Sequence, residues 1–66
     1  MRLTVNGKLF DTEKAETLAG LLEELRIGPE RVAVEINMTI VKKSDYSTFL
    51  LKEGDRVEIV NFVGGG

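Results

Sequence analysis

One helical segment, in a chain otherwise patterned as strands, limits the possible fold most. The segment carries leucines at the helical spacing i, i+3, i+4 and i+7, namely Leu18, Leu21, Leu22 and Leu25. Thr17 can cap its start, Gly28 suits a left-handed residue at its end, and Pro29 cannot continue a helix. One helix can cover only one face of a sheet, so the other face must meet water or a partner protein.

A hairpin is predicted before this helix. Asn6 and Gly7 readily supply the two positive φ angles of a type I′ turn, the strongest short-range hairpin signal. With a two-residue turn, Val5 lies opposite Lys8. Because side chains alternate along a strand, Leu9 is then expected on the face opposite that of Val5.

The remaining strands follow the helix. Residues 32–36 have large apolar side chains at every second position, which predicts a half-buried strand. Residues 37–39 read as a turn into a short segment at 40–41, and residues 42–52 are expected to contain one helical turn. Gly54 suits a turn before the last strand, at residues 56–61. The predicted fold class is therefore α+β, a mixed sheet with one main helix packed on one face.

Composition excludes several function classes. Apolar residues make up 42% and charged residues 30% of the 66 residues, as in ordinary globular domains. The sequence contains neither Cys nor His, which removes the thiol nucleophile, the commonest general base and the usual zinc ligands. A net charge of −2 argues against nucleic acid as the partner. No apolar run is long enough for a membrane span and no signal peptide is evident, so the cytoplasm is the expected location.

The acidic pairs do not suggest catalysis. Glu23 and Glu24 are adjacent on the predicted helix and should point apart, and Glu53 and Asp55 lie in a predicted turn. We interpret all four as solvated charges. An independent enzyme is therefore not expected.

The last residues carry the remaining candidate chemistry. Gly64, Gly65 and Gly66 have no side chain to pack, which predicts a flexible glycine tail at residues 64–66 after a domain at residues 1–63. Transfer of AMP from ATP would turn the Gly66 carboxylate into an electrophile. The sequence lacks a phosphate-binding loop, so a partner enzyme must use the ATP and no cofactor is expected on this chain. A frayed, inert tail is the alternative.

These features closely resemble the bacterial sulfur carrier proteins of thiamin biosynthesis, the ThiS family, whose fold is the ubiquitin-like β-grasp. The similarity covers essentially the whole chain. The matching segments are Asn6-Gly7-Lys8, residues 17–18, 21–22, 32–37, 40–41 and 54–60, and the ending Phe62-Val63-Gly64-Gly65-Gly66.

The resemblance implies a carrier cycle with three partners. An E1-like adenylyltransferase (ThiF-like) would adenylate Gly66, and sulfur passed from a cysteine desulfurase would convert it to a thiocarboxylate. The thiocarboxylate would then donate its sulfur to thiazole synthase (ThiG-like). Gly64 and Gly65 would form the narrow stem that enters the partner. The immediate sulfur donor and an acyl-disulfide intermediate stay open.

The uncovered sheet face is the predicted docking surface. We expect Val60, Phe62 and Val63 to contact the partners, with Leu9 a weaker candidate, because apolar side chains rimmed by charge mark interaction sites. Packing against residues 42–52 is the alternative for Val60 and Phe62.

Two departures from the family pattern lie in that same segment. Lys42-Lys43 stand where many relatives have Pro-Arg, and Tyr46 stands where an aromatic residue, often Trp, is usual. These departures could affect which partner is preferred.

Other functions stay open at this point. A molybdopterin synthase small subunit is also a β-grasp sulfur carrier. A ubiquitin-like protein modifier would join its terminal glycine to a lysine, and a binding module would use the sheet face alone.

Overall fold

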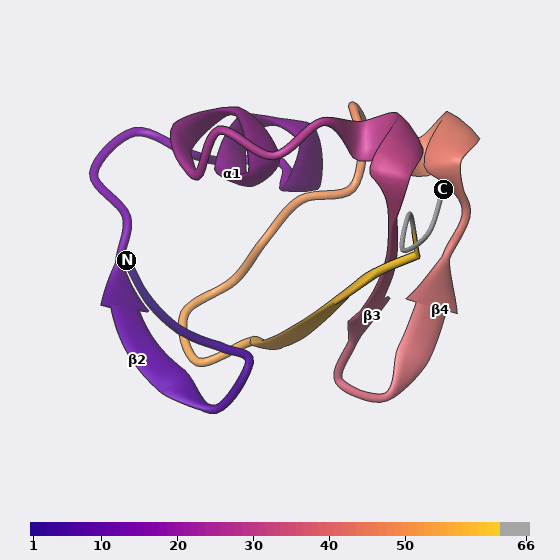
Figure 1. Cartoon of the computed structure of the whole chain (residues 1–66). Coiled ribbons are helices and arrows are strands. Elements are labelled where there is room, and N and C mark those ends of the chain that lie inside the picture. Colours follow the sequence, from indigo (N-terminus) through magenta and orange to yellow (C-terminus); the bar gives the residue numbers. More distant parts are fainter. Residues whose placement is uncertain (63–66) are drawn as a thin grey trace.

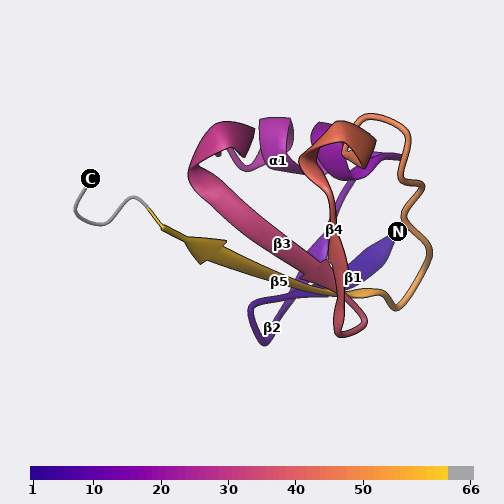
Figure 2. The same ribbon diagram turned by 90° about the vertical axis from the view of Figure 1, so that its right-hand side faces the viewer.

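The computed structural model describes residues 1–62, and its strands form one five-stranded mixed sheet in the order β2-β1-β5-β3-β4. Strand β1 runs parallel to β5, and the other neighbours are antiparallel. Helix α1 and the 3-10 turns η1 and η2 lie on one side of the sheet (Figures 1 and 2). The predicted α+β fold is confirmed. The element bounds are β1 Arg2–Val5, β2 Lys8–Asp11, α1 Leu18–Glu24, η1 Pro29–Arg31, β3 Val32–Ile36, β4 Thr39–Val41, η2 Lys43–Asp45 and β5 Arg56–Asn61.

The first hairpin forms as its sequence dictates. Asn6 and Gly7 have φ angles of 49° and 83°, and Val5 pairs with Lys8. The same register pairs Leu9 with Thr4, on the face opposite α1. The predicted turn, register and face are all confirmed.

The first turn of α1 is capped by Thr17 and by the segment of residues 42–52, which connects β4 to β5. The Thr17 hydroxyl accepts the Gly20 N–H at 3.0 Å, as predicted. The Leu18 and Ala19 N–H groups donate to the carbonyls of Phe49 and Tyr46, at 3.0 and 2.8 Å. The free N–H groups of the first turn therefore find partners without water.

The end of α1 differs from the prediction. Arg26, not Gly28, takes the left-handed conformation, with φ of 60°, while φ of Gly28 is −71°. The Ile27 N–H donates to the Leu22 carbonyl at 2.9 Å, and the Arg26 N–H donates to the Glu23 carbonyl at 3.0 Å. These two bonds form a Schellman motif. Because Ile27 then packs against the core, the helix closes two residues early and Gly28 instead precedes η1.

The core lies between α1 and the covered face of the sheet. The leucines of the predicted helical stripe are buried except Leu25, which is half-buried at the helix end. The segment of residues 42–52 contributes Tyr46 and Leu51 to the core. The fully buried large side chains are Leu3, Leu18, Leu21, Leu22, Val32, Val34 and Val57.

The turn between β3 and β4 has two residues, because Asn37 and Met38 both adopt positive φ, 54° and 70°. The prediction placed Thr39 in the turn as well, whereas Thr39 belongs to β4 and pairs with Ile36. Met38 is 90% exposed in a conformation that glycine normally fills. The turn therefore stores strain in an exposed apolar residue.

The start of β5 is fixed by a buried carboxylate. Asp55 is 5% exposed and accepts hydrogen bonds from the Lys52 N–H at 2.8 Å and the Asn37 Nδ2 at 2.9 Å. The interpretation of Asp55 as a solvated charge was wrong. Gly54, with φ of 86°, turns the chain so that this carboxylate faces inward. Asn37 also accepts the Arg56 N–H at 3.0 Å, which joins the β3–β4 turn to β5.

Candidate functional site

The face of the sheet opposite α1, which we call the open face, mixes apolar and charged side chains. Val60 lies beside Ala33, and Glu58 lies beside Glu35. On the far side of Glu35 lies Ile40, 72% exposed. Apolar and charged side chains are therefore neighbours on the open face.

The predicted docking residues in the described part of the chain are all exposed. The exposed fractions are 58% for Val60, 55% for Phe62 and 70% for Leu9. Val60 is therefore not packed under residues 42–52. Leu9 does not join the other two, because its neighbours across the sheet are Thr4 and then Arg56. Arg56 lies about 13 Å along β5 from Val60.

The other predicted site residues, Val63, Gly64, Gly65 and Gly66, lie outside the described residues. So does the boundary predicted at residue 63. Their roles stay predictions.

Phe62 is held from two sides. Its N–H donates to the Arg31 carbonyl at 3.1 Å, which ties it to the end of η1. The Lys43 ammonium, from η2, lies 4.7 Å from the centre of the Phe62 ring, within the range of a cation–π contact. Phe62 thus contacts the 42–52 segment at Lys43, yet more than half of its surface stays exposed.

Near its C-terminal end, strand β5 pairs with β3 on one side and no longer pairs with β1 on the other. Its pairing with β1 ends at Val57, and the Asn6 side chain extends this contact by two residues. Asn6 Oδ1 accepts the Ile59 N–H at 2.7 Å, and Asn6 Nδ2 donates to the Ile59 carbonyl at 3.3 Å. Beyond Ile59, the ladder continues with β3 alone, up to Asn61 opposite Val32. Figure 2 shows this end of β5 extending past β1 and β2.

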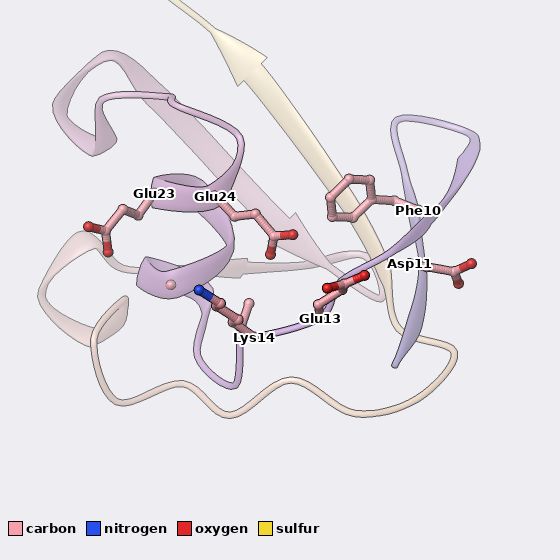
Figure 3. Close-up of a pocket in the computed structure, with 8 residues that line it drawn as sticks. Phe10, Asp11, Glu13, Lys14, Glu23 and Glu24 are labelled. Atoms are coloured by element: carbon pink, nitrogen blue, oxygen red, sulfur yellow. The ribbon is translucent and has the colours of Figure 1, made fainter.

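One hollow of about 680 Å³ lies on the other side of the molecule, between β2 and α1 (Figure 3). Phe10, Glu13 and Lys14 are among its lining residues. Figure 3 shows Glu23 and Glu24 pointing apart, as predicted for adjacent helix residues. Glu24 accepts a hydrogen bond from the buried Thr12 hydroxyl at 2.5 Å, which gives this carboxylate a structural role.

An ion pair crosses the hairpin on the open face. The Arg2 Nε donates to Asp11 Oδ1 at 2.8 Å, and both side chains are exposed. The hydrogen bond from Arg2 lowers the pKa of Asp11 below its ordinary value. Burial, by contrast, raises the pKa of the Tyr46 hydroxyl in the core. Neither shift lies in a site where a substrate could react.

Residues 1–62 offer neither a metal site nor a membrane-spanning helix. No group of three or more acidic side chains in this range is placed to hold a metal ion. No helix in the same range is long and apolar enough to cross a membrane.

Sequence reasoning missed three residues at or near this site. The exposed Ile40 could have been found, because a buried Val41 places its neighbour on the opposite face. The sequence placed Asp55 in a turn, but no local pattern indicated that its carboxylate is buried. The sequence marks Lys42-Lys43 as a departure from the family pattern, but the contact of Lys43 with Phe62 was missed, since it joins residues far apart in the sequence.

The fold and the exposed end of β5 define a ubiquitin-like β-grasp module that presents its last strand. The family model of the ThiS family matches residues 3–66. The chain belongs to the ThiS family. Its structure superimposes on the crystal structure of the thiamine biosynthesis protein ThiS from Geobacter metallireducens with a TM-score of 0.84 and 38% identity, covering all of both chains.

Two kinds of curated relatives are similar to the chain. Sulfur carrier protein ThiS from Bacillus subtilis is 38% identical over 65 residues, which cover 97% of this chain and 98% of that protein. A thiazole synthase from Magnetococcus marinus is 42% identical over all 66 residues of this chain. The chain spans about a fifth of the length of that relative, 20%. A second thiazole synthase, from Paramagnetospirillum magneticum, has the same identity and coverage.

Proposed function

We propose that the chain is a sulfur carrier of thiamin biosynthesis whose Gly66 carboxylate is converted to a thiocarboxylate. The observation that carries this proposal is the family match, which extends through the final glycines to residue 66. The exposed end of β5 supports it, because Phe62 lies at the surface, four residues before Gly66. The cytoplasm, where ATP is available, is the proposed location.

The chemistry requires a partner that binds ATP. A carboxylate oxygen attacks the α-phosphorus of ATP, the bond between the α- and β-phosphates breaks, and pyrophosphate leaves. A sulfide equivalent then attacks the carbonyl carbon of the acyl adenylate, and AMP leaves with one of the original oxygens. The sulfide equivalent is either free sulfide or the terminal sulfur of a desulfurase persulfide, and in the second case a thiol reductant supplies the two electrons that break the S–S bond and release the thiocarboxylate. The net change replaces one carboxylate oxygen with sulfur. The proposed partners for these steps are a ThiF-like adenylyltransferase and a cysteine desulfurase.

A thiazole synthase is the proposed sulfur acceptor. In two relatives with this name, a region similar to the whole of this chain belongs to the same polypeptide. Joining two functions in one polypeptide raises their effective concentration, which favours partners that act in sequence. This arrangement supports a ThiG-like partner for the present chain.

The proposed docking surface contains Val60, Phe62 and Val63, and Leu9, which lies apart from them on the open face, stays a weaker candidate. Exposed apolar side chains gain most when a partner covers them. Replacing Phe62 with Asp should weaken adenylation by about tenfold or more and leave cooperative unfolding intact, since loss of a buried aromatic anchor costs about 2 kcal/mol. Loss of cooperative unfolding would instead identify Phe62 as part of the core.

The decisive experiment is the intact mass of the chain after incubation with the adenylyltransferase, ATP and a sulfur source. We expect a gain equal to the difference between one sulfur and one oxygen atom. A variant lacking Gly66 and a reaction without ATP are the controls, and both should keep the original mass. An unchanged mass with an enzyme that adenylates a known carrier, or attachment of the chain to a lysine of another protein, would contradict the proposal.

A further inference from the structure

We propose that Lys43 is a positioning residue, which holds the Phe62 ring from η2 and so restricts the movement of Phe62, the point from which the chain leaves β5. The inference rests on the proposed function, because it concerns how residues 63–66 are delivered to the adenylating partner. Within residues 1–62, this is the one contact between a cation and an aromatic ring.

The backbone and the ring of Phe62 are held by different elements. The backbone is fixed by the hydrogen bond from its N–H to the Arg31 carbonyl, 3.1 Å, at the end of η1. That bond still allows the side chain to rotate about its own torsions. The Lys43 ammonium, 4.7 Å from the ring centre, favours the rotamer that brings the ring beneath it. Together the two contacts define both the position and the orientation of Phe62.

Lys43 can act in this way because its own backbone is anchored in the core. Its carbonyl accepts the Tyr46 N–H at 3.1 Å. Tyr46 is 4% exposed, and its carbonyl in turn accepts the Ala19 N–H of α1 at 2.8 Å. The lysine side chain therefore extends from a fixed base, and Phe62 is linked through η2 to the main helix.

The position of Phe62 matters because the reactive group lies beyond it. The four residues that follow it can span at most about 14 Å when fully extended. Holding Phe62 in place therefore limits the volume that the terminal carboxylate can reach. Misplacement by about 1 Å at a reacting group can lower a rate a hundredfold, so a fixed starting point aids entry into a narrow active site. The exposed half of Phe62 stays available to the partner.

The structure suggests a matched set of variants. Lys43→Gln removes the cation over the ring, and Lys43→Arg keeps a cation that can stack on it. Lys42→Gln removes the same charge one residue earlier, from an exposed side chain outside this contact. If lysines only attracted an acidic partner, Lys42→Gln and Lys43→Gln would lower kcat/KM for adenylation equally. A positioning role affects Lys43→Gln alone.

The first measurement concerns the free chain and needs no partner. In NMR spectra, the ε-methylene protons of Lys43 should be shifted upfield by the Phe62 ring current, and Phe62→Leu should abolish the shift. The ε-methylene protons of Lys42 provide the internal control. Unshifted Lys43 protons in the wild-type chain would overturn the proposal, whether or not the chain proves to be a sulfur carrier.

The second measurement is kcat/KM for adenylation, with the carrier chain as the varied substrate. We expect Lys43→Gln to lower kcat/KM by about two- to fivefold, the effect of a cation–π contact at an exposed site. Lys43→Arg and Lys42→Gln should match the wild-type chain in kcat/KM, and all three variants should keep cooperative unfolding. An equal loss in Lys42→Gln, or a loss in Lys43→Arg as large as in Lys43→Gln, would overturn the positioning role. Failure of the wild-type chain to react would refute the proposed function instead, and the NMR result would still decide whether the contact exists.

Discussion

At its start, β5 lies between two strands and is clamped by side chains, whereas at its end it pairs with β3 alone. Asn6, Asn37 and Asp55 surround the first half of the strand with side-chain hydrogen bonds. Among residues 1–62, Phe62 donates a backbone hydrogen bond to the Arg31 carbonyl and contacts the Lys43 ammonium. Burial on the helix-facing side of β5 follows the same gradient, since Val57 is buried, Ile59 is half-buried and Asn61 is exposed.

The difference shows how a small domain can be stable and still present one strand to a partner. The side-chain hydrogen bonds that stabilise β5 lie near its start. The residues proposed to bind partners, Val60 and Phe62, lie at its end. Substitutions at the start should therefore change the free energy of unfolding. Substitutions at the end should change binding to partners.

The largest effect on stability is expected from Asp55→Ala. It leaves the Lys52 N–H and the Asn37 amide without their buried acceptor, and should lower the free energy of unfolding by about 2–4 kcal/mol. Chemical denaturation measures this loss. Glu58→Ala, at an exposed position on the same strand, is the control and should change stability by less than about 0.5 kcal/mol. If the two substitutions lowered the free energy of unfolding equally, Asp55 would not be the residue that fixes the start of β5.

The same substitution at two positions of β5 tests the comparison directly. Val57→Ala should cost about 2 kcal/mol of stability, because it leaves a cavity in the core. Val60→Ala should cost less than about 0.5 kcal/mol, since the side chain is exposed. In a binding assay with the adenylyltransferase, Val60→Ala should weaken the complex. If the folded Val57→Ala variant weakened it as much, the division of roles along β5 would be wrong.

A gain in stability is expected at the turn that anchors the start of β5. Met38 has φ of 70°, where an L-residue pays for contact between its Cβ and the backbone. Met38→Gly should therefore raise the free energy of unfolding by about 1 kcal/mol. Thr39→Gly, in the adjacent strand, should be destabilising instead. A loss of stability in Met38→Gly would show that the Met38 side chain contributes contacts that outweigh the strain.

The smallest effect concerns the Arg2–Asp11 pair, far from β5's end. The pKa of Asp11 is lower in the folded chain than its ordinary value, so the pair stabilises the fold above the unfolded pKa, near about 3.9. This contribution is lost as the pH falls through the folded pKa. The stability difference between the wild-type chain and Asp11→Asn should therefore shrink towards zero below about pH 3.9. A difference that stayed constant between neutral and acid pH would contradict the assigned cause.

Local chemistry made much of the fold predictable. Asn6-Gly7 determined both the first turn and the register of its hairpin, and Thr17 with the leucine stripe located the start of α1. The end of α1 was not predictable in the same way. Packing of Ile27 against the core favoured a left-handed Arg26 over the glycine two residues later.

The site was predictable in part for the same reason. Alternation along β5 correctly put Val60 on the open face. The burial of Asp55 and the contact of Lys43 with Phe62 depend on segments brought together by the fold, and no local pattern reports such contacts. Leu9 shared the predicted face, but the strand order placed it away from the end of β5.

Amide hydrogen exchange along β5, with and without the adenylyltransferase, tests the central claim most directly. In the free chain, the Ile59 amide, held by Asn6, should exchange far more slowly than the Phe62 amide. Addition of the enzyme should slow exchange at Phe62 and leave Ile59 nearly unchanged. Equal protection of the two amides in the free chain, or no added protection at Phe62 in the complex, would contradict a strand anchored at its start and presented at its end.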